Sequence, residues 1–179
     1  MIAAMNRSWL LAFFAILVAG GSWLWASRVP LSAQPGNLRP EPAIGYPAPD
    51  FRLDTLDGDR FQLSAVRGTP VVLNFWATWC GPCQRELPAL QNAAEVYAGE
   101  VLIVGVDQGE EAAIVQAYVD KLGLTFPMPL DKEMEAGTLF NVKGMPTTYF
   151  IDGDGVIRHI WTGEMNSVTL AEGIAKIWP

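Results

Sequence analysis

The chain of 179 residues contains two cysteines, Cys80 and Cys83, and they stand two residues apart in the segment WCGPC. Thiols at this spacing can form a redox-active disulfide, supply half of a zinc site or bind copper. Which of these three chemistries the pair performs decides most of the function of the protein.

The rest of the sequence argues against a zinc site and against a purely structural disulfide. A structural zinc ion takes four ligands, usually from a second CxxC pair or from two histidines. The chain has no third cysteine, and its only histidine, His159, lies 76 residues beyond Cys83. A disulfide that closes so short a loop contributes only about 2 kcal/mol in the chain-entropy model. We therefore expect a redox pair and no metal.

The elements predicted around the cysteines favour the same interpretation. Residues 70–78, PVVLNFWAT, are an almost continuous apolar run typical of a strand buried on both faces. A helix is predicted over residues 82–97, so Cys80 stands where a strand ends and a helix begins. Free N–H groups and the positive end of the helix dipole stabilise a thiolate at that position.

The two residues between the cysteines suit this turn. Pro82 lacks the N–H that would have no partner in the first helical turn, and Gly81 allows a tight turn and leaves room for an incoming chain. Cys80 is therefore expected at the exposed tip of the helix as the attacking thiol. Cys83 is expected to be shielded and within its reach.

The remaining pattern predicts an α/β domain with a mixed sheet. Two short alternating runs around Asp57-Gly58 predict a β-hairpin. Extended segments are predicted over residues 101–107, 126–131, 147–152 and 156–163, and helices over residues 110–124, 132–141 and 167–178. Alternating strands and helices followed by an antiparallel hairpin and a helix are typical of an α/β sandwich.

The N-terminal residues predict a membrane anchor and a linker. Residues 8–27 carry no charge, and 20 apolar residues in a helix cross a hydrocarbon core of roughly 30 Å. The apolar run exceeds the ~7–15 residues of a signal-peptide core. Residues 1–28 are interpreted as an uncleaved anchor, with a cleaved signal peptide or a buried helix as alternatives. A proline-rich linker over residues 29–44 leads to the globular domain, residues 45–179.

The charge of the chain excludes one class of partner. From residue 43 onward the chain carries nine Lys or Arg and 18 Asp or Glu, a net charge of −9. No basic stripe is present, so nucleic acid is not expected as a partner.

The motifs FWATWCGPC and KGMPTTYFID resemble the thioredoxin superfamily. The longer stretch that begins PAPDFRLDTLDGDRF is similar to its membrane-anchored TlpA/ResA-type branch of exported thiol–disulfide oxidoreductases. The resemblance covers roughly residues 45–179. It implies a thioredoxin-like three-layer sandwich with a mixed central sheet, preceded by one transmembrane anchor, and it implies no cofactor.

The resemblance also implies roles for particular residues. Cys80 would be the nucleophile and Cys83 the resolving thiol. Pro146 would be a cis-proline whose loop faces the disulfide, and Met145 would offer its backbone to an extended substrate peptide. The expected substrate-binding residues are Trp79, Gly81, Pro82, Met145 and Pro146, with Trp79 at the rim of the site.

Two positions bear on proton transfer. Six residues before Cys80 the chain has Asn74, where cytosolic thioredoxin has a buried aspartate, and an amide cannot take a proton. Glu86 lies three residues after Cys83 on the same face of the helix, and the TlpA/ResA group resembles the chain there. A carboxylate held near Cys83 can accept its proton during resolution; the alternative for Glu86 is a solvated helix charge.

The function that the resemblance implies is that of a protein-disulfide reductase facing the periplasm or the cell exterior. Its substrates would be disulfides of exported proteins, with apocytochrome c as the first candidate, and a membrane electron donor would regenerate the dithiol. A peroxiredoxin-like peroxidase remains an alternative, although the PxxxTxxC pattern is missing. A copper chaperone of the same fold is another, although such carriers tend to use CxxxC with a histidine.

Overall fold

The computed structural model describes residues 16–17 and 38–178. The predicted anchor over residues 1–28 lies outside the described residues except for residues 16–17, which are helical, and the predicted linker lies outside them up to residue 37. Among the residues that are described, none belongs to a helix long and apolar enough to cross a bilayer.

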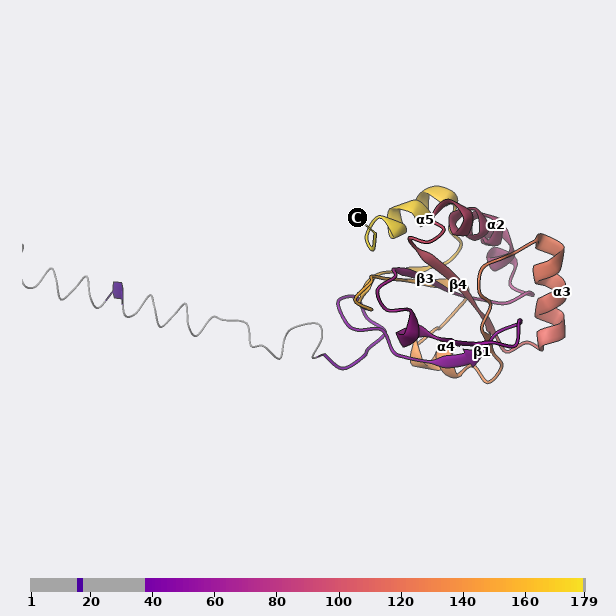
Figure 1. Ribbon diagram of the computed structural model, residues 1–179, viewed down its shortest axis with the longest axis horizontal. Coiled ribbons are helices and arrows are strands. Elements are labelled where there is room, and N and C mark those ends of the chain that lie inside the picture. The colour runs from indigo at the N-terminus through magenta and orange to yellow at the C-terminus, as the bar shows by residue number, and fades with distance from the viewer. Residues whose placement is uncertain (1–15, 18–37, 179) are drawn as a thin grey trace, which may run out of the picture. The chain divides into compact units, whose positions relative to one another are not determined.

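A five-stranded mixed sheet forms the centre of the domain, as predicted (Figure 1). Its middle strand, β3 (Val71–Trp76), pairs in parallel with β4 (Leu102–Gln108) and antiparallel with β6 (Thr147–Ile151). The edges are β5 (Leu130–Asp131) and β7 (Ile157–Thr162), in the order β5-β4-β3-β6-β7. All residues of β3 are buried, because other elements cover both faces of this strand.

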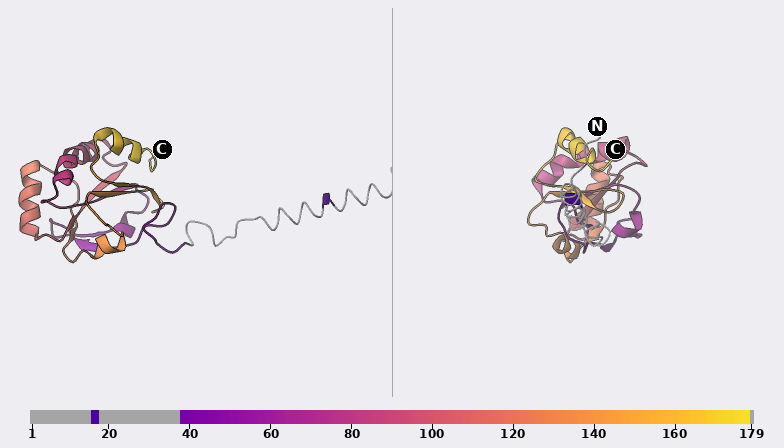
Figure 2. Two further views of the ribbon diagram at one scale, coloured as in Figure 1. Left: turned by 180° about the vertical axis from the view of Figure 1, so that it is seen from behind. Right: turned by 90° about the vertical axis from the view of Figure 1, so that its left-hand side faces the viewer.

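Helices cover both faces of the sheet and make the fold an α/β sandwich of three layers. The helices α2 (Gly81–Val96) and α5 (Ser167–Ile174) lie on one face, and α4 (Glu135–Leu139) lies on the other (Figures 1 and 2). α3 (Ala112–Leu122) adds buried valines to the same core cluster as α2 and α5. On that face, α2 packs against α5 and against β4.

The predicted hairpin forms a small sheet of its own on the α4 side. It consists of β1 (Arg52–Asp54) and β2 (Arg60–Gln62), which pair antiparallel, and a short 3₁₀ helix, η3 (Leu63–Val66), follows. The aromatic rings of Phe51 and Phe61 pack in the core cluster on this face of the sheet.

Two predicted elements are shorter in the structure. The predicted extended segment over residues 126–131 forms only the two-residue strand β5, because Pro127 and Pro129 accept hydrogen bonds from β4 through their carbonyls but have no N–H to return. The predicted helix over residues 132–141 shrinks to α4, because Met134 adopts a left-handed backbone conformation with φ 55° just before it.

Gly173 allows α5 to approach the sheet closely. A Cβ atom at Gly173 would lie 2.2 Å from the ring of Phe150, which is fully buried. Alanine normally stabilises a helix by about 1 kcal/mol relative to glycine. Here we expect Gly173→Ala to lower the free energy of unfolding by about 1–3 kcal/mol instead, because the ring must shift within a filled core. Urea denaturation of the full-length protein measures the difference.

Gly144→Ala is the matched control, because a Cβ atom at Gly144 would meet no atom within 4 Å. Its free energy of unfolding should stay within about 0.5 kcal/mol of wild type. A Gly173→Ala protein as stable as this control would contradict the packing of α5 on Phe150.

Candidate active site

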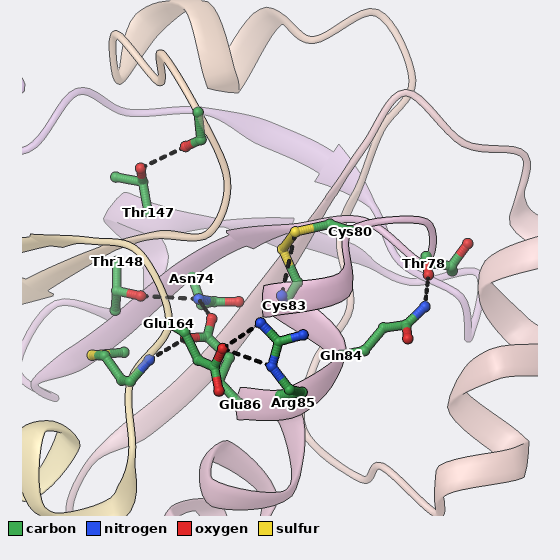
Figure 3. Close-up of a disulfide and its surroundings, with 12 residues drawn as sticks. Asn74, Thr78, Cys80, Cys83, Gln84, Arg85, Glu86, Thr147, Thr148 and Glu164 are labelled. Carbon is green, nitrogen blue, oxygen red and sulfur yellow. Dashed lines mark hydrogen bonds and ion pairs between the residues drawn. A yellow bond between two sulfur atoms is a disulfide. The ribbon is translucent and has the colours of Figure 1, made fainter.

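Cys80 and Cys83 form a disulfide at the N-terminal end of α2 (Figure 3). Cys80 is the N-cap of the helix, and its sulfur accepts a hydrogen bond from the Cys83 N–H at 3.3 Å. Gly81 opens the helix and Pro82 stands in its first turn. The end of β3 and the start of α2 thus bring the Cys80 sulfur to the place where free backbone N–H groups gather.

Cys80 is less exposed than predicted. Only 5% of Cys80 is accessible in the disulfide state, and Cys83 is fully buried. The bond to Cys83 is the physical reason, because it ties the Cys80 sulfur to a residue inside the core. Trp79, the residue directly before Cys80 in the sequence, is 69% exposed, so its apolar ring is accessible at the surface.

The Met145–Pro146 peptide bond is cis, as the resemblance to the thioredoxin superfamily implied. Met145 is partly buried and packs against the core cluster that contains both cysteines. The loop is fixed at two points: the Gly163 N–H donates to the Pro146 carbonyl at 2.8 Å, and the Thr147 hydroxyl donates to the Gly144 carbonyl at 2.7 Å.

Glu86 is 1% exposed and therefore is not a solvated helix charge. Its Oε1 accepts a hydrogen bond from Asn74 Nδ2 at 2.7 Å, and its Oε2 accepts one from the Met165 N–H at 2.9 Å. Burial raises the pKa of Glu86 to about 7, the two hydrogen bonds oppose that rise, and the charge of Glu164 adds to it. A carboxyl group with this pKa can accept and return a proton at neutral pH.

The hydrogen bonds that Asn74 makes in the site were not predicted from the sequence. Its amide donates both to Glu86 and to the Thr148 hydroxyl, the latter at 2.9 Å, and so links β3, α2 and β6 (Figure 3). Its presence in an otherwise apolar buried strand was the available signal, because a buried amide requires partners. The strand pattern did not show which residue of the helix would provide one.

An ion pair lies at the edge of this network. Arg85 contacts Glu164 at 2.6 Å, and Glu164 directly precedes the residue whose N–H binds Glu86. Both side chains are partly exposed, so the pair contributes little to stability. It does join α2 to the loop that precedes α5.

His159 lies on β7 with its ring 5.5 Å from that of Phe150, and burial lowers its pKa. Within residues 16–17 and 38–178, no three or more His, Cys, Asp or Glu side chains are arranged to hold a metal ion.

Comparison with protein families and relatives gives a consistent result. The model of the AhpC/TSA family matches residues 44–160. The thiol-disulfide oxidoreductase ResA of Geobacillus kaustophilus is 38% identical over 138 residues, which cover 76% of this chain and 79% of the relative. The thioredoxin-like protein YneN of Bacillus subtilis is 35% identical over 164 residues, which cover 90% of this chain and 93% of the relative.

Solved structures are similar as well. A secreted Mycobacterium tuberculosis disulfide oxidoreductase homologous to E. coli DsbE aligns with a TM-score of 0.64 and 29% identity, over 70% of this chain and 94% of that one. A thiol:disulfide interchange protein of the thioredoxin family from Chlorobium tepidum aligns with a TM-score of 0.67 and 25% identity, over 78% and 97%.

Substituting Glu86→Gln should change how stability depends on pH. The pKa of Glu86 rises from 4.5 to about 7 on folding, so between these values the unfolded chain releases a proton that the folded protein keeps. Wild type should therefore lose stability as pH rises from 4.5 to 7, by at most roughly 3 kcal/mol. Glu86→Gln should lack this loss in urea denaturation of the oxidised protein.

The matched control is Glu95→Gln, which changes an exposed carboxylate on the same helix and should keep the wild-type profile.

The Glu86→Gln variant also probes proton transfer, because thiol–disulfide exchange should accelerate through pH 7 in wild type and not in Glu86→Gln. Identical pH profiles in wild type and Glu86→Gln would show that the buried carboxyl group does not titrate there.

Proposed function

Since this chain belongs to the AhpC/TSA family and its relatives are ResA-type thiol–disulfide oxidoreductases, we propose that it reduces disulfides in exported proteins. The observation that carries the proposal is the CxxC disulfide at the start of α2 with the carboxyl group of Glu86 buried one turn behind Cys83. No observation within the described residues favours a peroxidase or a copper carrier over this function.

The reaction runs through two exchanges of disulfide bonds. The Cys80 thiolate attacks one sulfur of the substrate disulfide, forms a mixed disulfide and releases the other substrate sulfur as a thiolate. Cys83 then gives its proton to Glu86 and attacks the Cys80 sulfur, which closes the Cys80–Cys83 bond and expels the second substrate sulfur. The helix N-terminus supports the first step, and the pKa of Glu86, about 7, supports the second.

The residues around the disulfide are proposed to bind the substrate as an extended peptide. Exposed Trp79 offers apolar contact, and Gly81 has no side chain to block approach to the disulfide. Pro82 keeps the first turn of α2 free of an unpaired N–H, and the backbone of Met145 before Pro146 is proposed to pair with the peptide as an added strand.

The proposed location is the outer side of the cell membrane. The uncharged run over residues 8–27 supports an uncleaved anchor. The Mycobacterium tuberculosis relative is described as secreted, which agrees with an exported domain. Apocytochrome c is the proposed substrate, and a membrane electron donor is proposed to reduce the Cys80–Cys83 disulfide after each turnover.

The direction of electron flow can be tested by a redox titration of the protein against glutathione. The residues between the cysteines carry no charge and no histidine, and the Glu86 carboxylate opposes a second negative charge on the thiols. Both features destabilise the reduced form and favour donation of electrons. We expect a potential below about −220 mV, nearer the roughly −270 mV of thioredoxin than the roughly −120 mV of DsbA. A value near that of DsbA would make the protein an oxidant.

The substrate class can be tested with a Cys83→Ser variant, which should stop the reaction at the mixed disulfide. In the native host we expect full-length Cys83→Ser to accumulate covalent complexes with exported proteins that contain cysteine pairs, apocytochrome c among them. The double variant Cys80→Ser/Cys83→Ser is the control and should capture none. Capture of cytosolic proteins alone would contradict the proposed location, and capture without apocytochrome c would remove the role in cytochrome c maturation.

A further inference from the structure

All three polar groups of Thr78, which stands two residues before Cys80, form hydrogen bonds. Its N–H and its hydroxyl donate to Glu110 Oε2 and Oε1 at 2.5 and 2.6 Å. Its carbonyl accepts a hydrogen bond from Gln84 Nε2 at 2.5 Å (Figure 3). The segment between β3 and α2 is therefore tied on one side to α2 itself and on the other to the loop before α3.

Glu110, which makes two of these bonds, is itself held by a second carboxyl group. Its N–H donates to Asp107 Oδ1 at 3.2 Å. Asp107 is fully buried near the end of β4, and its Oδ2 has no hydrogen-bond partner among the described residues. Asp107 is buried beside the Glu110 carboxyl group, so ionising Asp107 as well as Glu110 carries a large energetic cost.

The groups that face Asp107 add negative charge and no positive charge. Burial and then the neighbouring Glu110 raise the pKa of Asp107 well above its ordinary value, with a smaller rise from Asp131 of β5. The partner of Asp107 on β3 is Trp76, which is uncharged. Lys132, which follows Asp131, is paired with Glu111 at 2.6 Å.

We propose that Asp107 keeps a proton beside the Glu110 carboxylate and that the two act as positioning residues that fix the segment before Cys80. With the proton on Asp107, Glu110 is the single negative charge of the pair and binds Thr78 with both oxygens. When Asp107 loses this proton to solvent, two adjacent carboxylates repel each other. Glu110 is the only one of the two near solvent, so it is the one that turns outward and releases Thr78.

Fixing this segment matters because the Cys80 sulfur changes its bonding partner during the proposed reaction. Its sulfur is bonded in turn to Cys83, to no atom and to a substrate sulfur, while the helix N-terminus must remain beside it. The inference rests on the proposed function in one respect, namely that Cys80 is the nucleophile. The hydrogen-bond arrangement of Thr78 and Glu110 does not depend on that assignment.

The proton on Asp107 can be tested by NMR on the full-length protein in detergent, with ¹⁵N-labelled threonine, from pH 6 to 10. An N–H bound to a carboxylate resonates at low field, so the Thr78 signal should move upfield in a step as Asp107 ionises. Asp107→Asn should remove the step, because the amide can donate to Glu110 and cannot ionise. Glu111→Gln is the matched control, an exposed neighbour that should titrate like wild type. An unchanged step in Asp107→Asn would overturn the proposal.

The positioning role can be tested by alkylation of Cys80 with iodoacetamide at pH 7, in the full-length protein carrying Cys83→Ser. If Glu110 acted only as a nearby negative charge, Glu110→Gln would favour the Cys80 thiolate and speed the reaction. If Glu110 positions the segment, Glu110→Gln should slow it by about threefold, because the thiolate loses part of the helix N-terminus. An equal or faster rate would overturn the positioning role.

The controls separate this inference from the proposed function. A Cys80 that reacts no faster than an exposed thiol in wild type would count against its role as nucleophile, whereas the Thr78 titration would still test the proton on Asp107. If Glu110→Gln does not fold, the comparison of wild type with Asp107→Asn decides the proposal alone.

Discussion

The hydrogen bond from the Asn74 amide to the Glu86 carboxyl group is the interaction on which the site depends. Burying a carboxylate costs several kcal/mol unless donors replace the lost water, and Asn74 is one of two donors that reach Glu86. Asn74 lies in the central strand, so its amide is fixed by the whole sheet. The hydrogen bond therefore holds α2 in a fixed position relative to β3, with Glu86 against the Asn74 amide.

Two buried carboxyl groups lie on elements next to β3, Glu86 on α2 and Asp107 on β4, and their environments give them different tasks. Glu86 receives two hydrogen bonds from neutral donors, which keep its pKa near 7. Asp107 faces Glu110 and Asp131 instead, so its neighbours favour the protonated form. One group is suited to exchange a proton at neutral pH and the other to retain one, although burial acts on both in the same direction.

The sequence predicted the parts of the fold that local pattern controls. The apolar run of β3, the turn at the start of α2 and the hairpins follow from residue types a few positions apart, and the structure contains them. The pairing of Asn74 with Glu86 and of Thr78 with Glu110 joins residues 12 and 32 positions apart, and no periodicity encodes such contacts. The low exposure of Cys80 was missed for a related reason, because it depends on the bond that its sulfur makes rather than on its place in the helix.

The proton affinity of Glu86 is set jointly by elements that are distant in the chain. The carboxyl group comes from α2, one donor from β3, the other from the loop before α5, and the opposing charge of Glu164 from that same loop. Removing one donor would push the pKa upward, and admitting water would push it down toward that of a free carboxyl group. A WCGPC segment on an isolated helix would therefore lack a base matched to neutral pH.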